Sequence, residues 1–214
     1  MTHKNEIARL AACGVVPVVV IDDAHLAVPL ARALLAGGID VIEVTLRRSA
    51  ALAALENIAR DVPEILAVAG TVVTPAQVKD VQAAGAQAVV SPGYSEAVDN
   101  AMRVAELPWL PGVATASDCM LATAAGRTTC KFFPAEQAGG TATLKALSGP
   151  FPQMKFCPTG GVSLANLGDY LALKQVICVG GSWLVPAEAI AQRDWNKVTT
   201  LAKEARERVV ELRG

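Results

Sequence analysis

The sequence contains few charged residues, few aromatic residues and few histidines. Charged residues make up 18% and aromatic residues 4% of its 214 residues, and the formal net charge is -1. Binding to nucleic acid or to anionic membranes favours a basic surface, and this composition provides no basic excess. Neither His3 nor His25 stands near a strand end suited to an active site, so we expect no histidine-based metal site.

Long apolar runs, targeting signals and paired cysteine motifs are also missing. The first ten residues mix both charge signs, and the apolar run that follows is interrupted by Pro17. No segment approaches the roughly 20 apolar residues of a membrane-spanning helix. The cysteines are odd in number and never form C-x-x-C, a pattern typical of reduced, mostly buried thiols in a cytoplasmic protein (Cys13, Cys119, Cys130, Cys157, Cys178).

Apolar residues, by contrast, are abundant and recur in short runs. They make up 52% of the chain, and no linker or charge block divides it, so we expect one domain over residues 1–214. The runs start 20 to 26 residues apart and are continuously apolar, which is typical of parallel strands covered on both faces. The expected strands are Val15–Ile21, Ile39–Thr45, Ile65–Ala69, Ala88–Ser91, Trp109–Val113, Thr129–Phe133, Lys155–Pro158 and Val176–Val179.

The segments between these runs carry helix signals. Ala24–Ala36 is rich in Ala and Leu and is followed by two glycines, and Thr74-Pro75 is a helix start. Further helices are expected to open at Ser95-Glu96 and Ser117-Asp118 and to cover Asn5–Ala12 and Trp195–Leu212. Eight strands alternating with helices favour a (β/α)₈ TIM barrel with an additional N-terminal helix; a large doubly wound sheet is the alternative.

Lys131 lies in an apolar run, between Cys130 and Phe132, where lysine is unusual. Desolvating an ammonium group costs several kcal/mol unless it is paired. Burial favours the neutral amine, which is a nucleophile toward carbonyl carbons. The alternative is a structural lysine paired with a nearby carboxylate.

Glu43 is a second polar residue within an expected strand. Alternation places it on the same face as Thr45, and Arg47 joins that face if the extended geometry persists. A functional carboxylate and a structural Glu43–Arg47 ion pair are both compatible with this pattern. Thr71 follows the third run, where its hydroxyl would cap a helix or bind a ligand oxygen.

Two glycine pairs follow the seventh and eighth runs, in PTGGVS at 158–163 and VGGSW at 179–183. Paired glycines let backbone N–H groups approach an anion closely, and in barrels the loops after strands seven and eight often bind phosphate. No dinucleotide-binding G-x-G-x-x-G motif is present. An amine, a carboxylate, a guanidinium and an anion site favour Schiff-base chemistry on a phosphorylated keto acid.

Seven motifs together resemble the family of 2-keto-3-deoxy-6-phosphogluconate (KDPG) aldolases, called KHG/KDPG aldolases where 4-hydroxy-2-oxoglutarate is also accepted. The resemblance extends from about residue 15 to residue 188. It implies a class I aldolase without metal or cofactor, usually a homotrimer, that acts in the Entner–Doudoroff pathway. The motifs are EVTLR (43–47), GTV (70–72), SPG (91–93), PG (111–112), KFFPAE (131–136), CPTGG (157–161) and GGSW (180–183).

The resemblance also implies roles for individual residues. Lys131 is similar to the Schiff-base lysine and Glu43 to the general acid/base, while Arg47 and Thr71 stand where the family binds the pyruvoyl carboxylate. The remaining positions would line the pocket (Pro92, Phe133) or hold the phosphate (Gly160, Gly161, Gly181, Ser182). The chain differs from the family's usual pattern at Val68, Ala114 and Ala116, positions that bear on loop shape and aldehyde specificity.

Three other functions fit parts of this pattern. The first is an aldolase for the phosphogalactonate epimer or for unphosphorylated 4-hydroxy-2-oxoglutarate. The second is a phosphosugar isomerase or epimerase, which needs acid/base pairs or metal ligands but no lysine nucleophile. The third is a non-catalytic barrel that binds a phosphorylated metabolite. A binder has no need for the amine, the carboxylate and the arginine together, which favours an enzyme.

Overall fold

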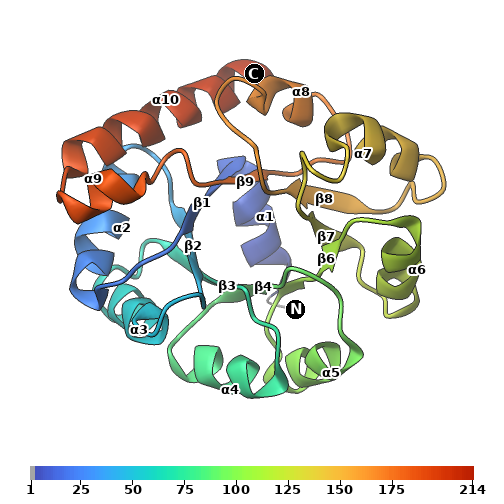
Figure 1. Ribbon diagram of the computed structural model, residues 1–214, viewed down its shortest axis with the longest axis horizontal. Helices are drawn as coiled ribbons and strands as arrows, with labels where there is room; N and C mark the ends of the chain where they lie inside the picture. Colours follow the sequence, from blue (N-terminus) through green and yellow to red (C-terminus); the bar gives the residue numbers. More distant parts are fainter. Residues whose placement is uncertain (1–2) are drawn as a thin grey trace.

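The protein has an α/β fold in which short strands alternate with helices along the chain (Figure 1). The computed structural model describes residues 3–214. The strands are β1 (Val15–Val19), β2 (Val41–Thr45), β3 (Leu66–Gly70), β4 (Ala88–Val90), β5 (Trp109–Leu110), β6 (Gly112–Val113), β7 (Thr129–Phe132), β8 (Lys155–Pro158) and β9 (Val179–Gly181).

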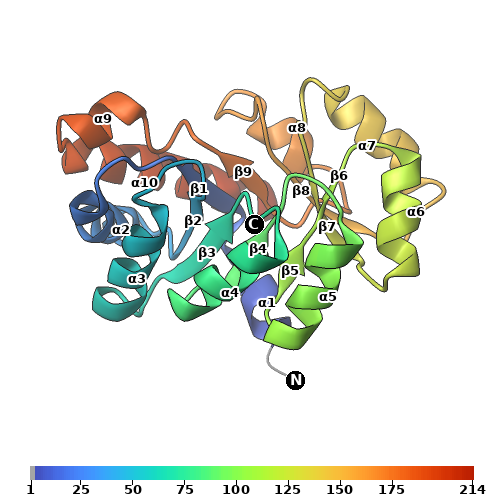
Figure 2. The same ribbon diagram turned by 60° about the horizontal axis from the view of Figure 1, so that its bottom comes forward.

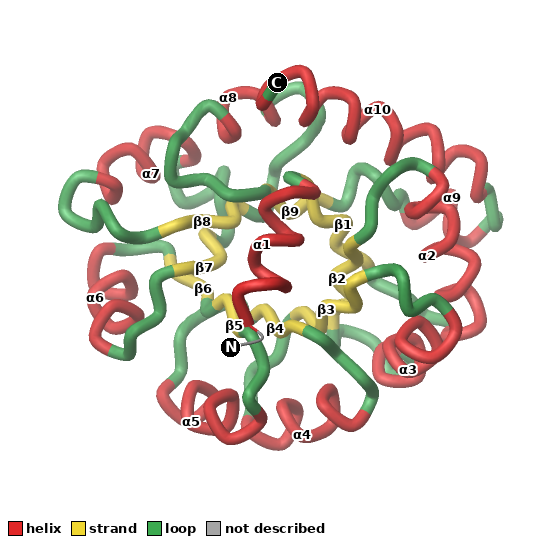
Figure 3. Tube along the Cα trace, turned by 180° about the vertical axis from the view of Figure 1, so that it is seen from behind, coloured by secondary structure: helices red, strands yellow, loops and turns green. Residues whose placement is uncertain are grey.

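The helices, apart from α1, lie outside the strands (Figure 3). They are α1 (His3–Cys13), the 3₁₀ turn η1 (Ala24–Leu26), α2 (Ala27–Ala36), α3 (Ala51–Asp61), α4 (Pro75–Ala83), α5 (Glu96–Ala105), α6 (Ala116–Ala124), α7 (Gly140–Ser148), α8 (Leu167–Leu171), α9 (Ala187–Ala191) and α10 (Trp195–Arg213). The predicted start of α4 is confirmed, with Thr74 and Gln77 forming a capping box around Pro75. The helix predicted to open at Ser117 begins one residue earlier, because Thr115 is its cap.

Every strand pairing is parallel. Six strands form one sheet in the order β5-β4-β3-β2-β1-β9, and β6-β7-β8 form a second. The predicted strand Trp109–Val113 is divided into β5 and β6 at Pro111, which has no N–H to donate to a ladder. An isolated bridge between Thr159, directly after β8, and Gly180 in β9 joins an edge of one sheet to an edge of the other. In Figure 3 the strands surround a central space, with helices on the outside.

The last strand lies three residues later than predicted. Residues 176–179 were expected, but Val176 forms only an isolated bridge, and β9 starts at Val179. The register with β1 decides this, because Val15 pairs with Val179 and Pro17 pairs with Gly181. Gly180 and Gly181, which were expected in a loop, therefore belong to β9. Their glycine pair is a turn signal, so sequence periodicity alone misplaced this strand.

The strands are covered on both faces, as their continuous apolar pattern predicts. Every residue of β2 and β3 is buried. The predicted N-terminal helix is α1, and it lies across one end of the strands (Figures 2 and 3). Its Arg9 pairs with Asp40 just before β2, so α1 covers the N-terminal ends of the strands. The carboxyl ends are on the opposite side.

The five cysteines are buried and free, as expected. Burial raises the pKa of the Cys13 and Cys119 thiols to about 11 and that of Cys130 to about 12, so these groups are thiols at neutral pH. Within residues 3–214, no helix is both long and apolar enough to cross a membrane.

Candidate functional site

Lys131 and Glu43 meet inside the ring of strands. Lys131 lies in β7 and Glu43 in β2, 88 residues apart in the chain, and Lys131 Nζ donates a hydrogen bond to Glu43 Oε1 over 3.2 Å. Their side chains are only 6% and 3% exposed. Two charged groups are rarely taken so far out of water, because desolvation costs several kcal/mol for each ion. The pair is a candidate reactive centre.

The alternative pairing of Glu43 with Arg47 is wrong. The strand ends at Thr45, and the chain then turns, with the Arg47 N–H bonded to the Thr45 carbonyl, so Arg47 does not continue the inward face. Arg47 is exposed at the carboxyl end of β2. Thr45 does share the inward face of Glu43, where it is buried and donates a hydrogen bond to the Val19 carbonyl. Arg47 therefore lies just beyond the carboxyl end of β2, exposed and outside the buried pair.

Thr71 lies at the neighbouring strand end in a strained conformation. Its φ is 63°, which is rare for a β-branched residue and costs about 1–3 kcal/mol. The helix-cap interpretation is wrong, because Thr74 caps α4. The Leu46 N–H bonds to the Gly70 carbonyl, so the chain segments after β2 and β3 run side by side. Arg47 and Thr71 consequently lie at the same edge of the sheet.

Gly70 is a further residue of the candidate site, one that the sequence did not reveal. A Cβ atom added there would lie 2.4 Å from Glu43 Oε1, so the glycine leaves room for the carboxylate. Its only sequence signal is a glycine at the end of a buried strand. Phe133 contacts the other partner, since Lys131 Nζ lies 5.1 Å from the centroid of its ring.

We expect Gly70→Ala to displace Glu43 and to lower kcat of the site's reaction by about tenfold or more, because small misplacement of a reacting group is costly. The residue has no left-handed φ, so the backbone tolerates alanine. The check is to compare steady-state kinetics with the thermal midpoint. Gly93→Ala, where an added Cβ meets nothing within 4 Å, is the matched control.

The remaining predicted residues lie on loops after the strands. Pro92 follows β4 and is half-buried, and its carbonyl lies where a Cβ on Gly112 would clash, at 2.1 Å. Gly160 and Gly161 follow β8 with φ of 103° and 77°, a region open mainly to glycine. Their turn therefore depends on having no side chains.

Gly181 ends β9, and Ser182 is exposed directly after it. Within the described chain, the amide groups of Gly161 and Ser182 donate to no backbone carbonyl. The helices that follow, α8 and α9, have five residues each and begin at Leu167 and Ala187, so a strong helix-dipole contribution is not part of this site.

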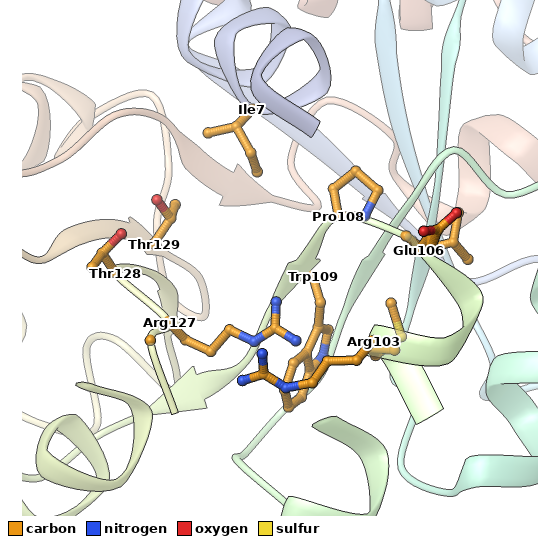
Figure 4. A pocket seen from close by; sticks show the side chains of 11 residues that line it. Ile7, Arg103, Glu106, Pro108, Trp109, Arg127, Thr128 and Thr129 are labelled. Carbon is orange, nitrogen blue, oxygen red and sulfur yellow. The ribbon is translucent and has the colours of Figure 1, made fainter. Parts of the chain in front are cut away.

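A cavity of about 400 Å³ lies at the opposite end of the strands, beside α1 (Figure 4). Arg103 and Arg127 both bind Asp99, with shortest distances of 3.0 and 2.6 Å, and Arg127 stacks on Trp109. The buried carboxylate is thus fully engaged by structural ion pairs. Among the described residues, no group of three or more His, Cys, Asp or Glu side chains could hold a metal ion.

Comparisons with known proteins agree with this arrangement. A model of the family "Aldolase: KDPG and KHG aldolase" matches residues 6–201. The KHG/KDPG aldolase of Escherichia coli strain K12 is 51% identical over 191 residues, which cover 89% of this chain and 90% of the relative. Both the match and the identity extend over nearly the whole chain.

Two solved structures have the same fold. One is KDPG aldolase from Legionella pneumophila with pyruvate captured at low pH as a covalent carbinolamine intermediate (TM-score 0.91, 49% identity, covering 94% of this chain and 97% of that one). The other is the Zymomonas mobilis ZM4 KDPG aldolase with 3-phosphoglycerate (TM-score 0.90, 41% identity, covering 96% of each chain). By sequence and by structure, the chain belongs to the KDPG and KHG aldolase family.

Proposed function

We propose that this protein is a class I aldolase that cleaves 2-keto-3-deoxy-6-phosphogluconate to pyruvate and D-glyceraldehyde 3-phosphate. The observation that carries the proposal is the buried contact between Lys131 and Glu43, at 3.2 Å. An amine beside a carboxylate in a dry site can add to a ketone and exchange protons with it. The related Legionella enzyme holds pyruvate as a carbinolamine, the adduct that such an addition forms.

The first half of the reaction builds the iminium. Glu43 first takes a proton from the Lys131 ammonium group, and the neutral amine then adds to C2 of the substrate, which breaks the C=O π bond and leaves the electron pair on oxygen. Glu43 takes a proton from Nζ of Lys131, which is now bonded to C2, and delivers one to the oxygen on C2. The product is the carbinolamine. A second proton delivered by Glu43 lets water leave, and the nitrogen lone pair forms the C=N bond.

The second half uses the iminium as an electron sink. The Glu43 carboxylate removes the C4 hydroxyl proton, which it later returns to C3, and the O–H electron pair becomes the aldehyde C=O bond. The C3–C4 bond breaks, its electrons form the C2=C3 double bond of an enamine, and the C=N electron pair returns to nitrogen. D-Glyceraldehyde 3-phosphate leaves. Protonation of C3 and addition of water to the iminium then release pyruvate and restore the amine of Lys131. No step requires a metal or an organic cofactor.

Loop residues orient the substrate in this proposal. Arg47 binds the keto-acid carboxylate, because a guanidinium can pair with both oxygens, and Thr71 donates to the same group. Phe133 and Pro92 line the pocket. The backbone amides of the two glycine loops and the Ser182 hydroxyl hold the phosphate, a role that suits unpaired amides.

We also propose the assembly and setting that this family implies. The two hydrogen-bonded sheets form one closed (β/α)₈ barrel, and residues 1–214 form a single domain. Three copies associate as a homotrimer that works in the cytoplasm on the Entner–Doudoroff pathway. Sedimentation velocity tests the trimer directly, since a dimer or a monomer at micromolar concentration contradicts it.

Trapping with borohydride tests the chemistry. Incubation with pyruvate and sodium borohydride is expected to add one reduced pyruvate per chain, and peptide mapping should place it on Lys131. The metal chelator EDTA should leave activity unchanged. An absence of adduct, or an adduct on another lysine, overturns the mechanism.

Cleavage of 4-hydroxy-2-oxoglutarate is a second candidate activity, because the matching family description includes KHG aldolase. Relative rates on substrates with and without the phosphate decide which activity dominates. An aldolase for the phosphogalactonate epimer would prefer that epimer in the same assay.

The phosphate assignment predicts the behaviour of Ser182→Ala. Loss of a hydrogen bond to a charged group should raise KM for the phosphorylated substrate about tenfold. The rate of borohydride trapping with pyruvate should stay unchanged, because pyruvate has no phosphate. Ser148→Ala is the matched control, since its hydroxyl donates to the Leu144 carbonyl within α7 and has no part in the proposed phosphate contacts. An unchanged KM for the Ser182 variant would contradict the assignment.

A further inference from the structure

Glu136 and Tyr170 form a clasp against the Gly160–Gly161 turn. The Glu136 side chain lies directly against the backbone of Gly161, because a Cβ added there would be 2.4 Å from Glu136 Cγ. The Glu136 N–H also donates to the Gly160 carbonyl over 3.0 Å. The Tyr170 hydroxyl, on α8, donates to Glu136 Oε1. The turn is thus linked through Glu136 to a buried tyrosine.

Asn166 holds the same turn from its other end. Its Nδ2 donates to the Gly161 carbonyl over 3.1 Å, and its Oδ1 accepts from the Ser163 N–H over 2.8 Å. These bonds close the loop between the turn and α8. The conformation with two left-handed glycines is therefore imposed by neighbours on both sides.

A cavity of about 360 Å³ separates the start of α7 from α8, and Glu136, Asn166 and Tyr170 are in its wall. The Tyr170–Glu136 hydrogen bond joins two residues of this wall. Removing it leaves the Glu136 side chain without its partner on α8.

The clasp also controls where a negative charge lies. A free carboxylate beside the turn would compete with a phosphate for the same amides and repel it. Instead, Glu136 Oε1 lies next to Gly140, the first residue of α7, where a helix N-terminus favours negative charge. Burial, together with the hydrogen bond to Glu136, raises the pKa of Tyr170 above its usual value, so the hydroxyl remains a donor at neutral pH.

We propose that Glu136 and Tyr170 are positioning residues that shape the Gly160–Gly161 turn for the substrate phosphate and hold the carboxylate of Glu136 away from it. This inference rests on the proposed function, in which that turn binds phosphate. It assigns neither residue a contact with the reacting atoms.

Tyr170→Phe is the principal test, because it removes one hydroxyl and keeps the ring that fills the core. KM for the phosphorylated substrate should rise about fivefold with kcat nearly unchanged, the loss expected for one hydrogen bond. The inhibition constant of inorganic phosphate should rise by the same factor. Borohydride trapping with pyruvate should proceed at the native rate.

Further variants separate positioning from folding. Glu136→Ala should reproduce the Tyr170→Phe phenotype, whereas Glu136→Gln retains an acceptor for the tyrosine and should restore most of the phosphate affinity. Thr123→Val, which removes a buried hydroxyl that has no partner among the described residues, is the matched control. Equal losses with phosphate-bearing substrate and with pyruvate, or no change in either, overturn the clasp.

The two hypotheses fail differently. If Ser182→Ala raises KM for the phosphorylated substrate while Tyr170→Phe does not, the clasp is wrong and the phosphate site stands. If neither variant alters phosphate affinity, the glycine loops do not bind phosphate, and both the assignment and the clasp are wrong. If pyruvate adds to no lysine, the aldolase mechanism itself fails.

Discussion

Lys131→Met is expected to lower kcat/KM for KDPG cleavage by at least about 10⁴-fold, the scale seen when a covalent nucleophile is removed. Methionine is close to lysine in length and suits the apolar surroundings, so the strand should still form. The variant leaves Glu43 buried without its cation, at a cost to stability of about 3–5 kcal/mol. Activity should therefore be measured well below the thermal midpoint.

Two controls make this result specific to the amine. Lys155→Met removes a half-buried lysine at the start of the neighbouring strand β8 and should retain activity and the pyruvate adduct. Intact-mass measurement after borohydride reduction should show no adduct on the Lys131 variant. Residual cleavage within a hundredfold of the native rate would mean that another group forms the covalent bond.

Glu43→Gln is expected to have the second-largest effect, a loss of about 10² to 10⁴ in kcat. Glutamine keeps the size of the side chain and a hydrogen-bond acceptor for Lys131, so the fold and the lysine position should persist. It cannot accept and return a proton as the carboxylate does. Trapping of pyruvate by borohydride should become slow without losing its final extent.

Chemical rescue distinguishes proton transfer from packing. Glu43→Ala opens a space beside Gly70, and added formate should restore part of the activity in proportion to its concentration. Sodium chloride at the same ionic strength should have no such effect. If Glu43→Gln retained native kcat, Glu43 would be a structural partner of Lys131 and not the proton carrier.

Local patterns in the sequence were sufficient to predict most of the secondary structure. Continuous apolar runs indicated strands buried on both faces, and Thr74-Pro75 marked the start of α4 correctly. The errors lie where a partner strand overrides a local signal. Gly180 and Gly181 are typical turn residues, yet they are in β9 because β1 pairs with them.

The site was predictable to a similar degree. A lysine and a glutamate within apolar strands were recognisable as unusual, because each is costly to bury alone. The short distance between Lys131 and Glu43 was not predictable from periodicity. Periodicity also did not show that β2 ends at Thr45, before Arg47. The role of Gly70 was also hidden, since it depends on a carboxylate from a neighbouring strand.

The sequence by itself determined most of the strands and helices, and it marked Lys131 and Glu43 as unusual polar residues within apolar strands. Hydrophobic periodicity and turn-forming residues act over a few neighbouring residues, so they can be recognised in a single sequence. Only the tertiary structure decided that Lys131 meets Glu43 across 88 residues and that Glu136 meets Tyr170 beneath the glycine turn. Such contacts depend on the register of parallel strands, which is set by pairing between distant segments.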